Sequence, residues 1–261
     1  MGRLTVKRSA ELPQIFSPRL QWDFPMWETR DKLNQPHRLG FPKHFVDGTV
    51  AVLAKNGGVQ LNPGVYAEAP FTAITDTNLV RKVRLGRSEI PIVTGATAVA
   101  KDLYQDGRLI VFGGTGAGLS FPVIGNSEGA GGDAADETII AIGGSLPIEL
   151  DTTSDVRVVS SRYRNLRQGT GAGELAVGFI PIIIPPNEYF WLIKTGPASG
   201  IAGEAITVST VAQMDLMPGG SGRLMLRNAA ADEGSQIIAT FADQVSAVAG
   251  GHMQIIARIG G

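Results

Sequence analysis

The chain carries the pentapeptide GTGAG twice, at residues 114–118 and 169–173. A glycine cluster after a strand binds phosphate when it opens a helix, because the helix N-terminus supplies amide donors. Here the glycines are spaced G-x-G-x-G, neither copy contains the lysine of a P-loop, and each copy precedes a strand-like stretch. We therefore predict two glycine-rich connections between strands, which use positive φ angles, and no nucleotide-binding loop.

The stretch GNSEG at residues 125–129 fits the G-x-S-x-G pattern of a hydrolase nucleophile. That pattern acts on a strained turn between a strand and a helix, and the triad would use Ser127, an aspartate and His252. The residues that follow do not predict a helix, and His252 lies in an expected C-terminal strand. We expect Ser127 to be an ordinary loop serine, and we predict no catalytic residue and no enzymatic activity.

Candidate metal ligands are few and poorly spaced. His37 and His44 lie seven residues apart, which matches no usual zinc spacing. The acidic loop with Asp133, Asp136 and Glu137 lacks the order of a calcium-binding EF-hand. Without cysteine, the chain has neither disulfides nor thiolate ligands. We predict no metal and no cofactor.

Composition indicates an ordinary globular protein. The 261 residues, 43% hydrophobic, suffice for a sizeable core, and the net charge of −1 indicates no general attraction to nucleic acid or membranes. The first residues lack the apolar segment of a signal peptide, and no stretch approaches the roughly 18–20 apolar residues that span a bilayer. We expect a soluble protein that folds in a cytoplasm, with no direct nucleic-acid or membrane partner.

Residues 1–45 differ from the rest of the chain. They hold eight Lys/Arg against four Asp/Glu, six of the seventeen aromatic residues, and five prolines that exclude a long helix. We predict an extended, proline- and aromatic-rich N-terminal arm that packs on its own body or on a neighbour. Its basic residues could contact nucleic acid, an acidic protein surface or solvent alone.

From residue 46 to 261, short β-branched and apolar runs alternate with Gly, Pro, Asn and Asp. No segment of twelve or more residues has helical periodicity, so this β-rich body is predicted to be an all-β sandwich or barrel. A boundary within it is expected near residues 86–96. The expected strands cover residues 49–54, 79–85, 98–103, 108–112, 120–124, 138–142, 146–150, 155–161, 175–184, 189–194, 205–210, 222–227, 236–241 and 252–259.

The order of elements in this body resembles that of a known family. In residues 108–166, a strand leads to the GTG turn, a strand ending in Gly-Asn, a Gly/Ala-rich loop, the sequence PIELDTTSDV and then Tyr-Arg-Asn. In residues 189–226, the aromatic strand YFW runs into TGP and small-residue strands. Order and spacing resemble those of head decoration (cement) proteins of tailed bacteriophages, over roughly residues 97–261.

The resemblance implies a non-enzymatic, β-rich virion protein. Such proteins are made in the host cytoplasm and form small homo-oligomers, typically trimers. They bind the major capsid protein on the outer surface of the capsid, where they resist the pressure of packaged DNA. A carbohydrate-binding or adhesin-type β module of a virion is the alternative.

The resemblance does not cover the arm, so its role is inferred from its residues alone. Large aromatic and arginine side chains dominate many protein interfaces. We expect Tyr189 and Trp191 to belong to the β core or to a face between subunits. The expected anchors of the arm on a partner protein are Phe16, Arg19, Trp22, Phe24, Trp27 and Arg30.

Overall fold

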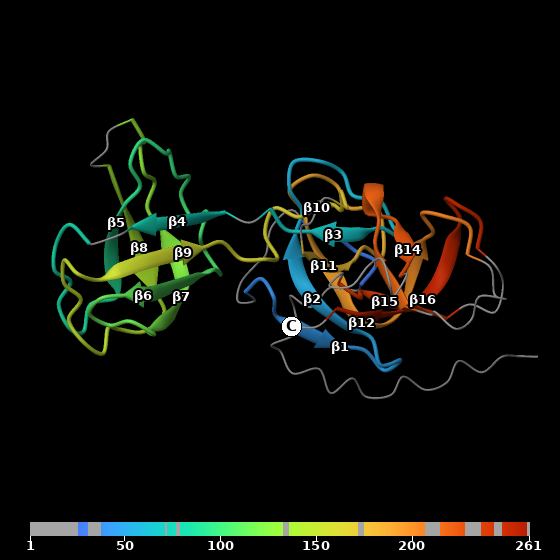
Figure 1. The fold of residues 1–261 in the computed structure, drawn as a ribbon, viewed down its shortest axis with the longest axis horizontal. Helices are drawn as coiled ribbons and strands as arrows, with labels where there is room; N and C mark the ends of the chain where they lie inside the picture. The colour runs from blue at the N-terminus through green and yellow to red at the C-terminus, as the bar shows by residue number, and fades with distance from the viewer. Residues whose placement is uncertain are drawn as a thin grey trace, which may run out of the picture.

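The structure is a computed structural model. It describes residues 26–30, 38–70, 72–76, 79–132, 136–171, 175–206, 215–227, 236–242 and 247–259. These residues form two antiparallel sheets that curl into separate lobes (Figure 1), with one short 3₁₀ helix, η3 (Gly220–Gly222). The all-β prediction is confirmed.

The larger lobe is one curled sheet, to which the described residues contribute ten strands. Its order is β10-β3-β11-β12-β16-β15-β13-β14, with β2 beside β12 and β1 beside β2. The strands are β1 (Pro42–His44), β2 (Val50–Lys55), β3 (Tyr66–Glu68), β10 (Arg167–Gln168), β11 (Ala176–Phe179), β12 (Tyr189–Ile201), β13 (Asp215–Pro218), β14 (Leu224–Leu226), β15 (Ala239–Phe241) and β16 (His252–Arg258).

Strand β12 organises this lobe because its two halves pair with different strands. Its first half pairs with β2 and β11, and its second half pairs with β16. The first half is apolar on both faces, as expected of a strand covered on both sides. Phe190 and Leu192 enter one core cluster, whereas Trp191 enters another with Leu39 and Leu53.

Part of the predicted arm covers the second face of β2 and β12. Strand β1 pairs with β2, with Lys43 opposite Ala51, and Leu39 is buried against Trp191. Further toward the N-terminus, Arg30 forms a β-bridge with Tyr189. The folded body therefore starts before the predicted boundary at residue 45. The reason is that Trp191 is buried partly by Leu39, a residue of the predicted arm.

The smaller lobe is a sheet to which the described residues contribute six strands, in the order β4-β9-β6-β7-β8-β5. Alternating burial along β6 and β9 places one apolar face inside the curl. Its strands are β4 (Ala73–Asp76), β5 (Glu89–Val93), β6 (Arg108–Gly113), β7 (Ser120–Asn126), β8 (Glu137–Ile142) and β9 (Asp155–Val159).

This lobe is an insertion in the larger one. Strands β3 and β10 pair directly, with Arg167 opposite Glu68, yet the whole smaller sheet lies between them in the sequence. Residues 86–96, where a boundary was predicted, instead contain β5, which pairs with β8. The division between the lobes lies at the two stretches of chain that precede β4 and follow β9 (Figure 1).

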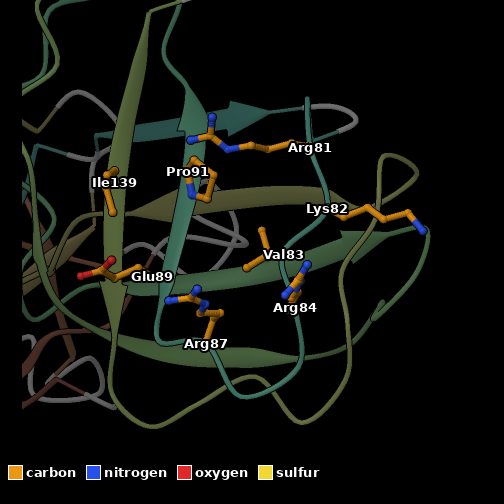
Figure 2. A pocket seen from close by; sticks show the side chains of 8 residues that line it. All are labelled: Arg81, Lys82, Val83, Arg84, Arg87, Glu89, Pro91 and Ile139. Carbon is orange, nitrogen blue, oxygen red and sulfur yellow. The ribbon is translucent and has the colours of Figure 1, made fainter.

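Three predicted strands of this lobe, at residues 79–85, 98–103 and 146–150, are not regular strands. Residues 79–85 and 146–150 meet through a single bridge between Val83 and Leu150, and residues 98–103 run from an isolated bridge at Val99 into turns. The first of these stretches passes beside β5 (Figure 2). The apolar residues of the first stretch pack into the core cluster of this lobe, so Leu79 and Val83 are buried without joining a ladder.

Candidate functional site

The first GTGAG connects β6 to β7 as a turn. Gly114, Gly116 and Gly118 have φ angles of +65°, +88° and +92°, a region that L-residues rarely adopt. A Cβ at Gly114 would also overlap the carbonyl oxygen of Thr153, whereas a Cβ at Gly118 would meet open space. The predicted connection between strands with positive φ angles is confirmed.

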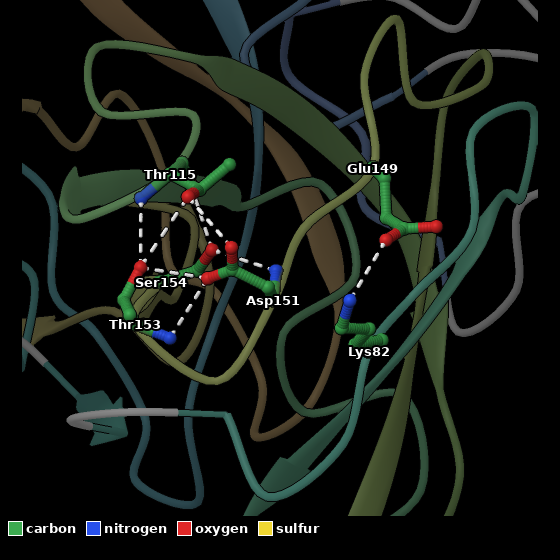
Figure 3. Close-up of polar contacts among 6 residues, drawn as sticks. All are labelled: Lys82, Thr115, Glu149, Asp151, Thr153 and Ser154. Atoms are coloured by element: carbon green, nitrogen blue, oxygen red, sulfur yellow. Dashed lines mark hydrogen bonds and ion pairs between the residues drawn. The ribbon is translucent and has the colours of Figure 1, made fainter.

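A carboxylate holds this turn in place (Figure 3). The Thr115 hydroxyl donates to Asp151 Oδ2 at 2.9 Å, and Asp151 Oδ1 accepts from the Thr153 amide at 2.8 Å. The Ser154 hydroxyl donates to the carbonyl of Thr115 at 2.7 Å. Hydrogen bonds from Thr153 and Thr115 hold the pKa of Asp151 below its usual value. Because an anion already occupies the turn, a phosphate would be repelled there.

The described part of the second GTGAG, residues 169–171, is likewise held by hydrogen bonds to a carboxylate. Glu68 on β3 is fully buried, and it accepts from the Thr170 hydroxyl at 3.2 Å and from the Gly171 amide at 3.3 Å. The Tyr66 ring fills the space beside Gly169, and its hydroxyl donates to the carbonyl of Gly219 at 2.8 Å. Burial, together with the Glu68 carboxylate, raises the pKa of Tyr66 to about 12.

The structure separates the two residues of the hypothetical hydrolase site. Ser127 lies in the smaller lobe, where its hydroxyl accepts from the Ile139 amide at 2.9 Å. His252 begins β16 of the larger lobe, where Nδ1 lies 3.2 Å from the exposed Ser199 hydroxyl. Ser127 is therefore placed as a loop serine that supports the β7–β8 connection.

The candidate metal ligands do not converge among the described residues. Glu137 forms an ion pair with Arg81 at 2.7 Å, and His44 is exposed on β1. His37 and Asp133 lie outside the described residues. The described part of the chain contains no group of three His, Asp or Glu side chains able to hold a metal ion. It also contains no helix long and apolar enough to cross a membrane.

Of the expected arm anchors, Phe16, Arg19, Trp22 and Phe24 lie outside the described residues. Arg30 is joined to the protein's own body, since its amide donates to the Tyr189 carbonyl at 3.0 Å and its carbonyl accepts from the Tyr189 amide at 2.7 Å. Its guanidinium pairs with Glu28 at 2.9 Å. Trp27 is 70% exposed, although the neighbouring Met26 packs against two core clusters.

The expected place of Trp191 in the core is confirmed, because only 2% of this residue is exposed. The ammonium of Lys43 lies 5.0 Å from the Trp191 ring centroid and 5.1 Å from that of Phe45. Half-buried Tyr189 lies under Lys55 at 5.2 Å. These rings thus tie part of the predicted arm to its own subunit.

A cleft of about 830 Å³, which the sequence did not indicate, lies between the lobes, with Tyr163 and Pro122 among its lining residues. Asp106 lies in it, accepting from the Leu39 amide at 3.4 Å and lying 3.8 Å from the Arg164 guanidinium. Burial raises the pKa of Asp106 despite these favourable partners. Leu39 is 67 residues away in sequence, so no local pattern could have revealed this contact.

A second cleft, of about 360 Å³, lies on the smaller lobe beside β5. Four of its eight lining residues are Lys or Arg, all within residues 81–87. The sequence signal is the run RKVRLGR, most of which belongs to the expected strand at residues 79–85.

Comparisons with family models, with curated proteins and with solved structures each found no match for this chain.

Proposed function

We propose that this chain is a structural virion protein that binds the outer surface of a phage head and stabilises the contacts between capsomers. The support is the resemblance of residues 108–166 and 189–226 to decoration proteins, together with the all-β body. The observation that carries the proposal is the 70% exposure of Trp27 beside a segment that is fixed to the body.

The fixed segment explains how the N-terminal region would engage a shell. Met26 packs against the core and Arg30 is bridged to β12, so Trp27 is presented from an anchored backbone. Pre-ordering of the backbone lowers the entropy lost on binding. Burial of one large apolar side chain contributes about 1.5–3 kcal/mol. Repetition of this contact by an oligomer that bridges capsomers would then multiply a modest single affinity.

The test is co-sedimentation with DNA-free phage heads that lack this protein. We expect saturable binding at a fixed number of copies per capsomer, and weaker binding by Trp27→Ala. Phe112→Ala is the matched control, because Phe112 is an exposed ring (45%) on the smaller lobe. No co-sedimentation of the full chain, or equal loss in both variants, would overturn the proposal.

A carbohydrate-binding module is the competing function. Such a module stacks sugars on neighbouring exposed rings. Among the described residues, the exposed Trp27, Phe41 and Phe112 belong to different segments, and Phe112 lies on the other lobe. Binding of the full chain to a glycan array, together with failure to bind heads, would favour this module.

A further inference from the structure

The cleft on the smaller lobe lies between residues 81–84 and the edge strand β5 (Figure 2). Pro91 and Ile139, which are cross-strand partners on β5 and β8, form its apolar side together with Val83. Its charged lining residues are Arg81, Lys82, Arg84, Arg87 and Glu89. The cleft thus combines an apolar surface with four cations and one acid.

Two of the four cations form ion pairs with acidic side chains of the described residues, and the other two do not. Arg81 is neutralised by Glu137 at 2.7 Å, and Lys82 lies 3.5 Å from Glu149. The guanidinium groups of Arg84 and Arg87 form no hydrogen bond or ion pair with any residue that the structure describes. Two exposed arginines therefore border the cleft with their donors available to a ligand.

The backbone holds both arginines in fixed positions. Val83 forms a two-way bridge with Leu150, and the Leu146 amide donates to the Arg87 carbonyl at 2.8 Å. The Gly86 amide donates back to the Leu146 carbonyl at 2.9 Å. Binding would therefore order little backbone, which favours affinity.

The charge of the lobe around the cleft limits which kinds of anion could bind there. Residues 73–159 contain eleven Asp/Glu against seven Lys/Arg, and four of those seven cations line this cleft. The rest of the lobe is therefore strongly acidic and repels an extended polyanion such as nucleic acid. A short acidic segment would contact the positively charged cleft without reaching the acidic surface around it.

The apolar surface favours a polypeptide ligand. Leu85 lies between the two arginines in sequence and is 64% exposed, although it is a large apolar side chain. Arginine beside exposed apolar surface is typical of protein interfaces. The outer edge of β5 includes Pro91, which has no N–H, so an added strand could not form a full ladder there. Side chains would therefore carry the recognition.

We propose that this cleft binds an acidic segment of a partner protein. Carboxylates of the segment pair with Arg84 and Arg87 through two parallel hydrogen bonds each, the geometry that guanidinium favours. An apolar side chain of the segment packs on Pro91 and Ile139. This site is separate from Trp27 and does not depend on the proposed virion role.

The test is an NMR titration of the full chain with the capped synthetic peptide Glu-Leu-Asp-Glu-Leu-Glu. We expect shift changes confined to residues around 81–91 and 139, and about tenfold weaker binding by Arg84→Ala/Arg87→Ala. Lys101→Ala removes an exposed cation of the same lobe outside the cleft and should bind as the unaltered protein does. Arg84→Lys/Arg87→Lys, which keeps the charge, should lose part of the affinity and thus report on bidentate pairing.

Three results would overturn the proposal. The first is the absence of shift changes with millimolar peptide, and the second is equal binding by the neutral peptide Gln-Leu-Asn-Gln-Leu-Gln. The third is tighter binding of inorganic phosphate or a short oligonucleotide than of the acidic peptide. Thermal unfolding of each variant shows whether it is folded, and the Arg→Lys pair replaces the Ala pair if the latter is not.

Discussion

The hydroxyl of Thr115 donates to the carboxylate of Asp151 at 2.9 Å, and it does so from the middle of a glycine-rich turn. Thr170, at the same position of the second pentapeptide, donates in the same way to Glu68 at 3.2 Å. Each turn is thus held by an acid from another part of the chain. A sequence that looks like an anion-binding loop is in both places bound to an anion of the protein itself.

Acidification should release the first turn. The pKa of Asp151 is lowered in the folded state from its ordinary value of 3.8 by hydrogen bonds from Thr153 and Thr115. The stability that it contributes is therefore present above pH 3.8 and is lost as pH falls through the lowered pKa. We expect Asp151→Asn to reduce the fall in melting temperature between pH 5 and pH 2.5, as measured by circular dichroism.

Part of the acid sensitivity should remain in that variant, because hydrogen bonds from Thr49 lower the pKa of Asp47 as well. Glu128→Gln, which alters an exposed acid of the same lobe, serves as the control. An unchanged pH profile in Asp151→Asn would contradict the assigned role of the carboxylate.

Two glycines of the first turn should differ in their tolerance of alanine. Gly118→Ala is expected to cost about 1 kcal/mol, because a positive φ disfavours an L-residue and open space surrounds the new Cβ. Gly114→Ala should cost about 2–4 kcal/mol, since its Cβ would also overlap the Thr153 carbonyl. Urea unfolding of both variants measures the difference, and equal losses would show that the turn relaxes.

Arg164→Ala should weaken the contact between the lobes in a pH-dependent way. Arg164 and Asp106 have side chains only 12% and 11% exposed, and burial raises the pKa of Asp106. Because this pKa is raised, the buried Asp106 carboxylate lowers the free energy of unfolding as pH rises through the pKa. Removal of the Arg164 guanidinium leaves the ionised Asp106 with less stabilisation, so we expect Arg164→Ala to lower the free energy of unfolding by about 1–3 kcal/mol at pH 8.

The loss in Arg164→Ala should be smaller at pH 4, where more of Asp106 is protonated. Urea unfolding at the two pH values, with Lys101→Ala as an exposed-cation control, checks this. A loss that is independent of pH would indicate that Arg164 acts through its bond to Gln105, at 3.2 Å, and not through Asp106.

The two tryptophans of the described residues should differ widely in how much their replacement by alanine changes stability. Trp191 is 2% exposed, so Trp191→Ala should cost about 3–5 kcal/mol through the lost burial and the cavity it leaves. Trp27 is 70% exposed, so Trp27→Ala should change the free energy of unfolding by less than about 0.5 kcal/mol. Denaturant unfolding followed by circular dichroism measures both, and a large loss in Trp27→Ala would assign that ring to the fold.

The expected strands were found both where a strand has one exposed face and where it is buried on both faces, as in β2 and the first half of β12. Residues 155–161 and 252–259 alternate between the two faces, and they contain β9 and β16. Residues 79–85 show a similar pattern but form only one bridge, and their apolar side chains Leu79 and Val83 pack into the core cluster of the smaller lobe without joining a ladder. β5 was missed because residues 86–96 were interpreted as a boundary, and the strand β8 with which β5 pairs is distant in the sequence.

The sequence by itself determined the all-β class and the two glycine turns, because side-chain alternation and positive φ angles are properties of a few adjacent residues. Only the tertiary structure decided what those turns contact. Thr170 meets Glu68 across 102 residues of chain because β3 and β10 pair around the inserted lobe. The burial of Trp191 beneath Leu39 and the placement of Arg84 and Arg87 beside β5 likewise depend on which distant segments the two sheets bring together.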